Sequence, residues 1–229
     1  MAAMSDAVPV TIAINDAVRV SGLLQAPPRV RACYVLAHGA GAGMAHPFMA
    51  DVASELAQRQ IATLRYHFPY MEQGGKRPDP PKVAHAAVRA AVAEAARRLP
   101  KLPLLAGGKS FGGRMTSQAQ AEHPLPGVRG LVFLGFPVHP AGRPSRDRGR
   151  HLFDVQIPML FLQGTHDALA TLDELQPLVA ALGERATLKL FGEADHSFRV
   201  PKRSGGTDAQ VLSEMLDALV AWIDTKIMG

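Results

Sequence analysis

Residues 107–113 read Gly107-Gly108-Lys109-Ser110-Phe111-Gly112-Gly113, and they contain the pattern G-x-S-x-G at 108–112. The apolar run 102–106 before it predicts a buried strand, and residues 111–122 after it predict a helix. A strand-to-helix turn of this kind holds its serine exposed in a strained conformation. The flanking glycines fit a turn in which backbones come too close for a Cβ. In this setting the pentapeptide indicates a nucleophilic serine.

The rest of the chain alternates short apolar runs with helical periodicity. Strands are predicted at 8–14, 18–24, 31–37, 61–68, 102–106, 131–136, 159–163 and 187–191. Helices are predicted around 48–56, 83–99, 111–122, 171–182 and 207–223, with loops rich in proline or glycine at 69–81 and 137–151. Two helix starts have the pattern of a capping box, Thr171 with Glu174 and Thr207 with Gln210, and Gly183 follows the end of the first.

This alternation predicts the fold class. Strands that are apolar throughout belong to parallel sheets covered on both faces. The first two strands have no helix between them and predict an antiparallel hairpin at the sheet edge. We therefore expect an α/β fold, doubly wound, with a mostly parallel sheet and helices on both faces, as a single domain over residues 1–229. In such sheets ligands bind beyond the carboxyl ends of the strands.

The amino-acid composition excludes several classes of protein. The 229 residues carry 25 basic and 20 acidic side chains, 47% are hydrophobic and 20% are charged, which excludes a collagen, a coiled coil and a fully disordered chain. The only cysteine, Cys33, lies in an apolar run and predicts a small buried side chain. The longest strongly apolar stretch, 131–138, is far shorter than the ~20 residues of a membrane span. Residues 1–6 lack a signal-peptide pattern, so we expect a cytoplasmic protein, a monomer or a homodimer, that does not bind membranes.

Two further side chains complete a candidate for nucleophilic catalysis. Asp167 follows the strand 159–163, and His196 follows the strand 187–191. A serine nucleophile needs a base, and the base needs an orienting carboxylate, in the chain order Ser, Asp, His for this kind of sheet. Ser110, Asp167 and His196 meet both requirements, each at the end of a different strand. This joint pattern is far more specific than any one of its parts.

Other residues near these strand ends have different predicted roles. Asp195 is expected to cap or orient its loop, while Asp173 and Glu174 belong to a helix start. Nothing assigns a role to His139, His151 or His166. The nine histidines show no H-x-x-x-H or H-E-x-x-H spacing, so neither a metal site nor a cofactor is expected.

An oxyanion hole is the fourth expected part. It takes the amide after the nucleophile, here that of Phe111, and an amide from the loop after the third strand. That loop is His38-Gly39-Ala40-Gly41, and the donor is Ala40 or Gly41. His38 is expected to hold this loop through side-chain hydrogen bonds; the alternative is a role in catalysis, as a contact to substrate.

The same turn also resembles the end of a nucleotide-binding loop, G-x-x-x-x-G-K-[ST], through Gly108-Lys109-Ser110. That motif needs glycine at position 103, where this chain has proline. A phosphate- or nucleotide-binding protein is therefore disfavoured.

Basic residues gather in two loops, Arg143, Arg146, Arg148 and Arg150 in one and Arg199, Lys202 and Arg203 in the other. Lys109 adds a charge beside the serine, unless it pairs with Glu72 or Asp79. If these residues line the site, with Lys109 and Lys202 as substrate contacts, an anionic substrate is favoured. The alternative is a solvated loop face, and no nucleic-acid partner is expected. The insert of about 20 residues before the strand at 159 is too short for a large lid, which favours small soluble substrates.

Six stretches carry a resemblance to a known family. They are Leu36-Ala37-His38-Gly39-Ala40-Gly41, Phe68-Pro69-Tyr70-Met71-Glu72, residues 107–115, Phe133-Leu134-Gly135-Phe136-Pro137, Gln163-Gly164-Thr165-His166-Asp167, and Asp195-His196-Ser197-Phe198 with Pro201-Lys202-Arg203-Ser204. From about residue 31 to the last helix, the chain resembles the α/β-hydrolases. More narrowly, it resembles the small branch that includes the testis-expressed hydrolase-like proteins, a chromatin-complex subunit and many bacterial predicted hydrolases.

The resemblance implies Ser110 as nucleophile, Asp167 as acid and His196 as base, as the residues themselves suggest. Phe111 is a departure, because much of this branch has methionine after the nucleophile; the amide role is unaffected. The function expected is a serine hydrolase, acting on small carboxylic esters or thioesters. Because some relatives serve as interaction subunits, a non-catalytic interaction module of the same fold is the alternative.

Overall fold

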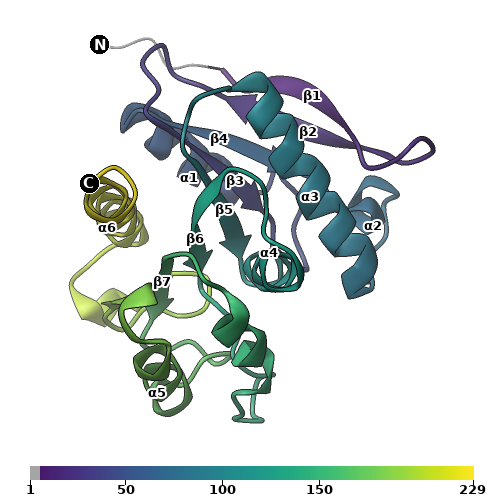
Figure 1. Ribbon diagram of the computed structural model, residues 1–229. Helices are drawn as coiled ribbons and strands as arrows, with labels where there is room; N and C mark the ends of the chain where they lie inside the picture. Colours follow the sequence, from purple (N-terminus) through teal and green to yellow (C-terminus); the bar gives the residue numbers. More distant parts are fainter. Residues whose placement is uncertain (1–5) are drawn as a thin grey trace.

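An eight-stranded sheet forms the centre of the protein in the computed structural model, which describes residues 6–229 (Figure 1). The strands lie in the order β1-β2-β4-β3-β5-β6-β7-β8. Their bounds are β1 Val8–Ala13, β2 Arg19–Gln25, β3 Ala32–Ala37, β4 Ile61–Tyr66, β5 Leu104–Lys109, β6 Val128–Leu134, β7 Met159–Gly164 and β8 Ala186–Phe191. Residues 1–5, part of the segment without a signal-peptide pattern, lie outside the described residues.

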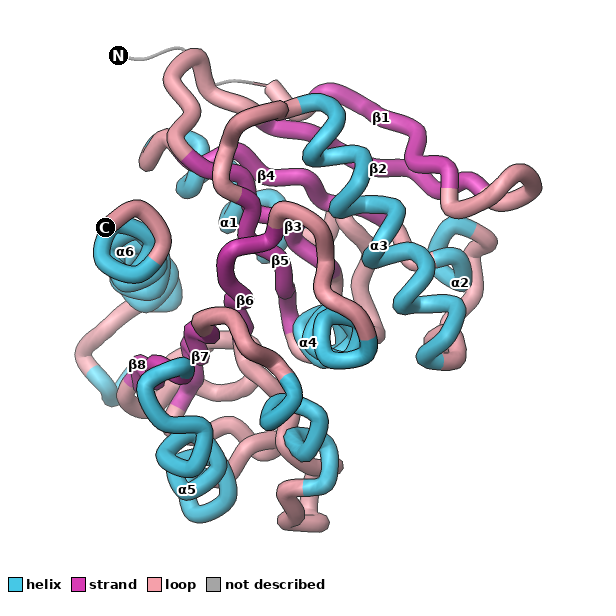
Figure 2. The backbone as a smooth tube through the Cα atoms, viewed as in Figure 1, coloured by secondary structure: helices cyan, strands magenta, loops and turns pink. Residues whose placement is uncertain are grey.

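The pairing of the strands confirms the predicted sheet. β1 and β2 form an antiparallel hairpin, and β2 joins β4 antiparallel. All further pairs, from β4–β3 to β7–β8, are parallel. Figure 2 shows β1 and β8 at opposite edges of the sheet. The predicted mostly parallel, doubly wound sheet with an antiparallel edge hairpin is therefore correct.

Helices cover both faces of this sheet. Their bounds are α1 Pro47–Gln58, α2 Pro69–Glu72, α3 Pro81–Arg98, α4 Phe111–Glu122, α5 Leu172–Leu182 and α6 Asp208–Lys226, with short 3-10 helices η1 Asp147–Asp154, η2 Gly183–Arg185 and η3 Lys202–Ser204. Buried side chains of α3, α4 and α5 share one apolar cluster with one face of the strands. Those of α1 and α6 share a second cluster with the other face.

Because helices cover both faces of the sheet, the central strands are apolar on both faces. All six residues of β3 are buried; Cys33 and Val35 point into one cluster, and Tyr34 and Leu36 into the other. Each such large apolar side chain contributes roughly 1.5–3 kcal/mol when fully buried. Cys33 is the small buried side chain expected, and burial raises the pKa of its thiol to about 12.

Some expected boundaries and caps differ from the structure. The region 69–81, expected to be loop throughout, contains α2, because Pro69 stands in the first turn where a missing N–H costs nothing. The Thr207–Gln210 capping box is confirmed. The predicted box at Thr171 is wrong: Thr171 is the N-cap, but its side chain makes no capping bond. Its hydroxyl and amide instead bond His139 Nε2, at 3.2 and 3.1 Å.

Candidate active site

Ser110 stands at the turn between β5 and α4. Its φ of 49° and ψ of −112° are strained for a residue with a Cβ. The turn tolerates no side chain at Gly108, because a Cβ there would lie 2.1 Å from the carbonyl oxygen of Ala37. A Cβ on Gly112 would lie 2.6 Å from the same oxygen. The glycines therefore let the turn pack directly on the end of β3.

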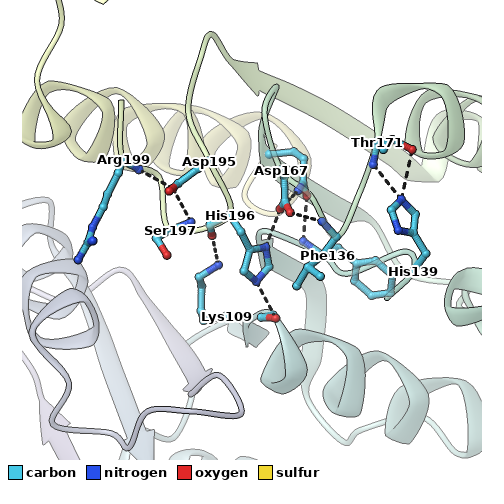
Figure 3. A network of polar contacts seen from close by, with 12 residues as sticks. Lys109, Phe136, His139, Asp167, Thr171, Asp195, His196, Ser197 and Arg199 are labelled. Atoms are coloured by element: carbon cyan, nitrogen blue, oxygen red, sulfur yellow. Dashed lines mark hydrogen bonds and ion pairs between the residues drawn. The ribbon is translucent and has the colours of Figure 1, made fainter. Parts of the chain in front are cut away.

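His196 links Ser110 to Asp167, although the three residues lie on three separate segments. Its Nε2 lies 2.8 Å from the hydroxyl of Ser110, and its Nδ1 lies 2.6 Å from Oδ2 of Asp167. Figure 3 shows the imidazole between Asp167 and the start of a helix. The carboxylate selects the tautomer with hydrogen on Nδ1, which leaves Nε2 free to accept a proton. The arrangement can therefore remove a proton from the serine hydroxyl.

The Asp167 side chain is fully buried and accepts three hydrogen bonds. Besides that of His196, they come from Nε2 of Gln163 at 2.5 Å and from the amide of Leu169 at 2.7 Å. Gln163 is itself buried, and its Oε1 accepts the amide of Phe136 at 2.9 Å. A buried carboxylate needs such partners to remain charged, and they also fix its orientation.

The loop that carries His196 is held by Asp195, as expected. Oδ1 of Asp195 accepts the amides of Ser197 and Arg199, at 2.7 and 2.9 Å. Its own amide donates to the carbonyl of Arg199 at 2.9 Å. The side chain of Asp195 therefore points into its own loop, near Ser197 and Arg199 (Figure 3). The imidazole of His196 points toward Ser110 instead.

Lys109, the residue before Ser110, also contacts the loop that carries His196. Its ammonium donates to the carbonyl oxygen of His196 and lies 5.4 Å from the centre of the Phe198 ring. Burial lowers the pKa of Lys109 to about 8, although the nearby carboxylates of Asp167 and Asp195 raise it. The alternative pairing of Lys109 with Glu72 or Asp79 is not found.

The loop after β3 passes beside this group. The side chain of His38 is buried; its Nδ1 bonds the carbonyl of Gly39 at 2.8 Å, and its Nε2 accepts the amide of Phe68 at 3.2 Å. His38 is not among the residues that line the cavity at Ser110, and its two hydrogen bonds agree with the structural role. Burial lowers the pKa of His38 to about 4, which keeps the ring neutral and able to accept at Nε2.

A cavity of about 930 Å³ opens in front of Ser110 and His196. Its wall comes from the loop after β3, residues 47–55 of α1, the turn at Ser110, Leu169, the loop 196–199 and the start of α6. The residues that line it are Gly39, Ala40, Gly41, Ala42, His46, Pro47, Phe48, Met49, Asp51, Ser54, Glu55, Lys109, Ser110, Leu169, His196, Ser197, Phe198, Arg199, Asp208, Ala209 and Leu212. The predicted oxyanion-loop residues Ala40 and Gly41 are thus on the wall, together with the serine and the histidine.

The two basic loops lie mostly away from the cavity. Of their residues, only Arg199 lines the cavity, and Lys202 does not. The first loop lies against α4 and α5 because His151 bonds Ser117 at 2.8 Å and Arg146 bonds Glu174 at 2.7 Å. Of the two alternatives, a basic rim and a solvated loop face, the cavity lining therefore favours the second for all of these residues except Arg199. The cavity wall is mixed in charge, with Lys109 and Arg199 against Asp51, Glu55 and Asp208.

The three unassigned histidines lie outside the cavity wall. His139 bonds the start of α5, and His151 bonds α4. His166 is exposed, and its amide donates to the carbonyl of Ala194 at 2.9 Å. Within residues 6–229, no group of three or more His, Cys, Asp or Glu side chains could hold a metal ion. Over the same residues, no helix has the length and apolar character needed to cross a membrane.

Sequence reasoning missed Gln163, Tyr70 and His46. Gln163 is a polar residue at the end of an otherwise apolar strand, and that contrast was an available signal. Tyr70 donates from its hydroxyl to the carbonyl of Ala40 at 2.8 Å, a contact with no local sequence signal. His46 caps α1 by accepting the amide of Phe48 at 3.3 Å, and both residues line the cavity.

The sheet order and the strand-to-helix turn at Ser110 define the α/β-hydrolase class of fold. The chain belongs to the family described as "Alpha/beta hydrolase domain", whose match covers residues 30–224. Among solved structures, it is similar to a dienelactone hydrolase from Anabaena variabilis, at 20% identity and a TM-score of 0.78, over 98% of this chain and 99% of that one. A Xanthomonas campestris serine hydrolase without a lid matches at 18% identity and a TM-score of 0.72, over 95% of each chain. The esterase domain of a Rhodothermus marinus protein matches at 17% identity and a TM-score of 0.72, over 95% of this chain and 97% of that one.

Proposed function

We propose that the protein is a serine hydrolase that cleaves small carboxylic esters or thioesters through an acyl-enzyme. One observation carries the proposal: the imidazole of His196 bridges Ser110 at 2.8 Å and Asp167 at 2.6 Å, at the wall of an accessible cavity. Families of this fold host many functions, so the site and not the fold supports the reaction.

In the first half of the reaction, His196 Nε2 takes the proton of the Ser110 hydroxyl, and the serine oxygen forms a bond to the substrate carbonyl carbon. The resulting imidazolium keeps its Nδ1–H on the Asp167 carboxylate, which stabilises the charge. Return of the proton to the leaving alkoxide or thiolate accompanies cleavage of its bond to carbon. An acyl group then remains on Ser110.

In the second half, a water gives a proton to His196 Nε2 and attacks the acyl carbon. The acid leaves as the proton returns to Ser110. The oxyanion of both tetrahedral intermediates accepts hydrogen bonds from the Phe111 amide and from that of Ala40 or Gly41. No hydrogen bond of the described residues uses these three amides. In well-studied enzymes, each such donor lowers the barrier by roughly 3 kcal/mol.

The cavity wall indicates the size and the charge of the substrate. Between β6 and β7 the chain contains only loop and η1, so no large lid covers the wall, which favours small soluble substrates. Because the wall carries both signs of charge, it gives no support to the predicted preference for anionic esters. Lys109 is the one cation beside the serine, and an acidic substrate group would have to reach it. Cytoplasmic location and a monomeric or homodimeric state stay predictions.

The test is hydrolysis of p-nitrophenyl acetate and butyrate, a matched thioester and a half-ester that carries a carboxylate. The wild type is expected to hydrolyse at least one of them, and Ser110→Ala to lose at least about 10³-fold in kcat. Ser54→Ala is the matched control, because Ser54 lines the same cavity without a histidine partner in the described structure. Equal loss in both variants, or none in Ser110→Ala, would contradict the proposal.

The alternative, a non-catalytic interaction module, predicts an occluded serine or a large exposed apolar patch. Ser110 is accessible from the cavity, and the large exposed apolar residues of the described chain are Val8, Val83, Phe153 and Met228, which lie on separate elements or loops. The described residues therefore show neither the occluded serine nor the large apolar patch that an interaction module predicts.

A further inference from the structure

Two consecutive carbonyl groups of the loop after β3 are held by buried side chains. The carbonyl of Gly39 accepts from Nδ1 of His38 at 2.8 Å. The carbonyl of the next residue, Ala40, accepts from the hydroxyl of Tyr70 at 2.8 Å. The rings of His38 and Tyr70 lie 6.0 Å apart, so both bonds reach the loop from one aromatic cluster.

These two bonds fix the direction of two amides. In a planar trans peptide the N–H points opposite to the C=O of the same unit. The amide of Ala40 shares its peptide unit with the carbonyl of Gly39, and the amide of Gly41 shares its unit with the carbonyl of Ala40. Both N–H groups are therefore directed away from the His38–Tyr70 side of the loop. Neither His38 nor Tyr70 lines the cavity, whereas Ala40 and Gly41 do.

Tyr70 is itself firmly placed. It lies in α2 directly after Pro69, and its amide donates to Oδ2 of Asp79 at 3.0 Å. Its ring packs against that of Phe68, and both contact the ring of Phe111, with centroids 6.5 Å and 5.2 Å away. One cluster thus supports the loop 39–41 and also the residue whose amide follows Ser110.

The phenol of Tyr70 stays protonated, so it can always donate its hydrogen bond to the Ala40 carbonyl. Its side chain is buried, and burial together with the charge of Asp79 raises the pKa of the phenol to about 12. The hydroxyl therefore remains a donor throughout the pH range of an ester assay. Within the described residues, the carbonyl of Ala40 has no other hydrogen-bond donor.

We propose that Tyr70 is a positioning residue of the hydrolase: through its hydrogen bond to the Ala40 carbonyl, it aims the Gly41 amide at the oxyanion that forms on the Ser110-bound substrate. The proposal rests on the proposed function. Tyr70 touches no reacting atom, so its removal should weaken binding of the transition state and leave binding of the ground state unchanged. Deleting an oxyanion donor outright costs about 10²–10³ in kcat, and releasing one from its support should cost roughly tenfold.

The experiment compares Tyr70→Phe with Tyr66→Phe in the full chain. Tyr66 is a buried tyrosine of the same cluster, 5.5 Å from the Phe68 ring, and its hydroxyl makes no bond to the loop 39–41 in the described structure. Tyr70→Phe should lower kcat about tenfold with KM little changed, and should weaken an alkyl boronic acid, which forms a tetrahedral adduct on the serine, by a similar factor. Tyr66→Phe should leave kcat and the boronate affinity near wild type.

The outcomes separate the two claims. If the wild type hydrolyses esters and Tyr70→Phe matches Tyr66→Phe in kcat and boronate affinity, the positioning role is overturned and the proposed function stands. A rise in KM alone also overturns it, because a merely structural change would act there. A wild type inactive on every ester overturns the proposed function and this inference with it. If Tyr70→Phe does not fold, Asp79→Ala removes the anchor of Tyr70 instead, and an unchanged kcat in that folded variant overturns the role.

Discussion

Replacement of Lys109 by methionine tests how much stability the protein loses by burying the Lys109 ammonium beside Ser110. The ammonium of Lys109 lies in a desolvated position, where it donates to the carbonyl of His196 and lies near the Phe198 ring. Methionine keeps most of the length and removes the charge. The variant loses one hydrogen bond, but it also loses the cost of keeping a cation away from water.

The size of that cost follows from the pKa. Burial lowers the pKa of Lys109 from the ordinary 10.5 to about 8. The difference corresponds to roughly 3 kcal/mol of lost stability below pH 8, where the folded protein must hold the charge. Between pH 8 and 10.5 the unfolded chain binds more protons than the folded one, so the stability of the wild type rises with pH. At pH 9.5 only roughly 1 kcal/mol of the cost remains.

Urea unfolding at pH 7.0 and pH 9.5, on wild type and on Lys109→Met, measures this directly. The free energy of unfolding of the variant, relative to wild type, should fall by about 2 kcal/mol between the two pH values. The lost hydrogen bond shifts both values equally and cancels in the comparison. Lys189→Met, at an exposed position of β8, is the control and should show no such change.

If the free energies of unfolding of Lys109→Met and wild type change in parallel across this pH range, burial does not lower the pKa of Lys109. Such a result would mean that Lys109 titrates near its ordinary pKa and that its ammonium is well solvated in the folded protein. A change of opposite sign would mean that neighbouring carboxylates dominate over burial.

Two further predictions concern the serine turn and its partners. Asp167→Asn should fold and lose about 10⁴ in kcat for ester hydrolysis, as in serine proteases, because the amide favours the wrong tautomer of His196; a loss under tenfold would contradict the role of the carboxylate. Gly108→Ala should lose more than about 4 kcal/mol of stability, because its Cβ would lie 2.1 Å from the carbonyl oxygen of Ala37. Thermal unfolding measures this loss. Gly192→Ala is the control, because a Cβ there has no atom within 4 Å. Equal melting temperatures of the two variants would contradict the close contact at Gly108.

Much of the fold was predictable because local signals agreed with the global arrangement. β3 and β7 are apolar on both faces, which only a doubly covered sheet allows. The hairpin β1–β2 was predictable from the missing helix between its strands. The short helix α2 was not, because four residues that begin with proline resemble a turn in sequence.

The candidate site was partly predictable for the same reason. Ser110, Asp167 and His196 each follow a strand, and parallel strands bring their carboxyl ends to one edge. The bond from Tyr70 to Ala40 spans 30 positions, and that between Gln163 and Asp167 depends on side-chain orientation. Such contacts depend on tertiary packing, which no local pattern encodes.

Charge was the least predictable property. The sequence shows where arginines cluster along the chain but not on which side of the sheet the loop folds back. The insert that carries Arg146 lies on α5, where Glu174 pairs with it, and Arg146 does not line the cavity.

The most direct test of the central claim, an activated serine at position 110, is labelling with a fluorophosphonate followed by peptide mapping. The wild type should be labelled on Ser110, Ser110→Ala and His196→Ala should abolish labelling, and Ser197→Ala, on the same cavity wall, should retain it. An unlabelled, well-folded wild type, or a label on another residue, would mean that Ser110 is not an activated nucleophile.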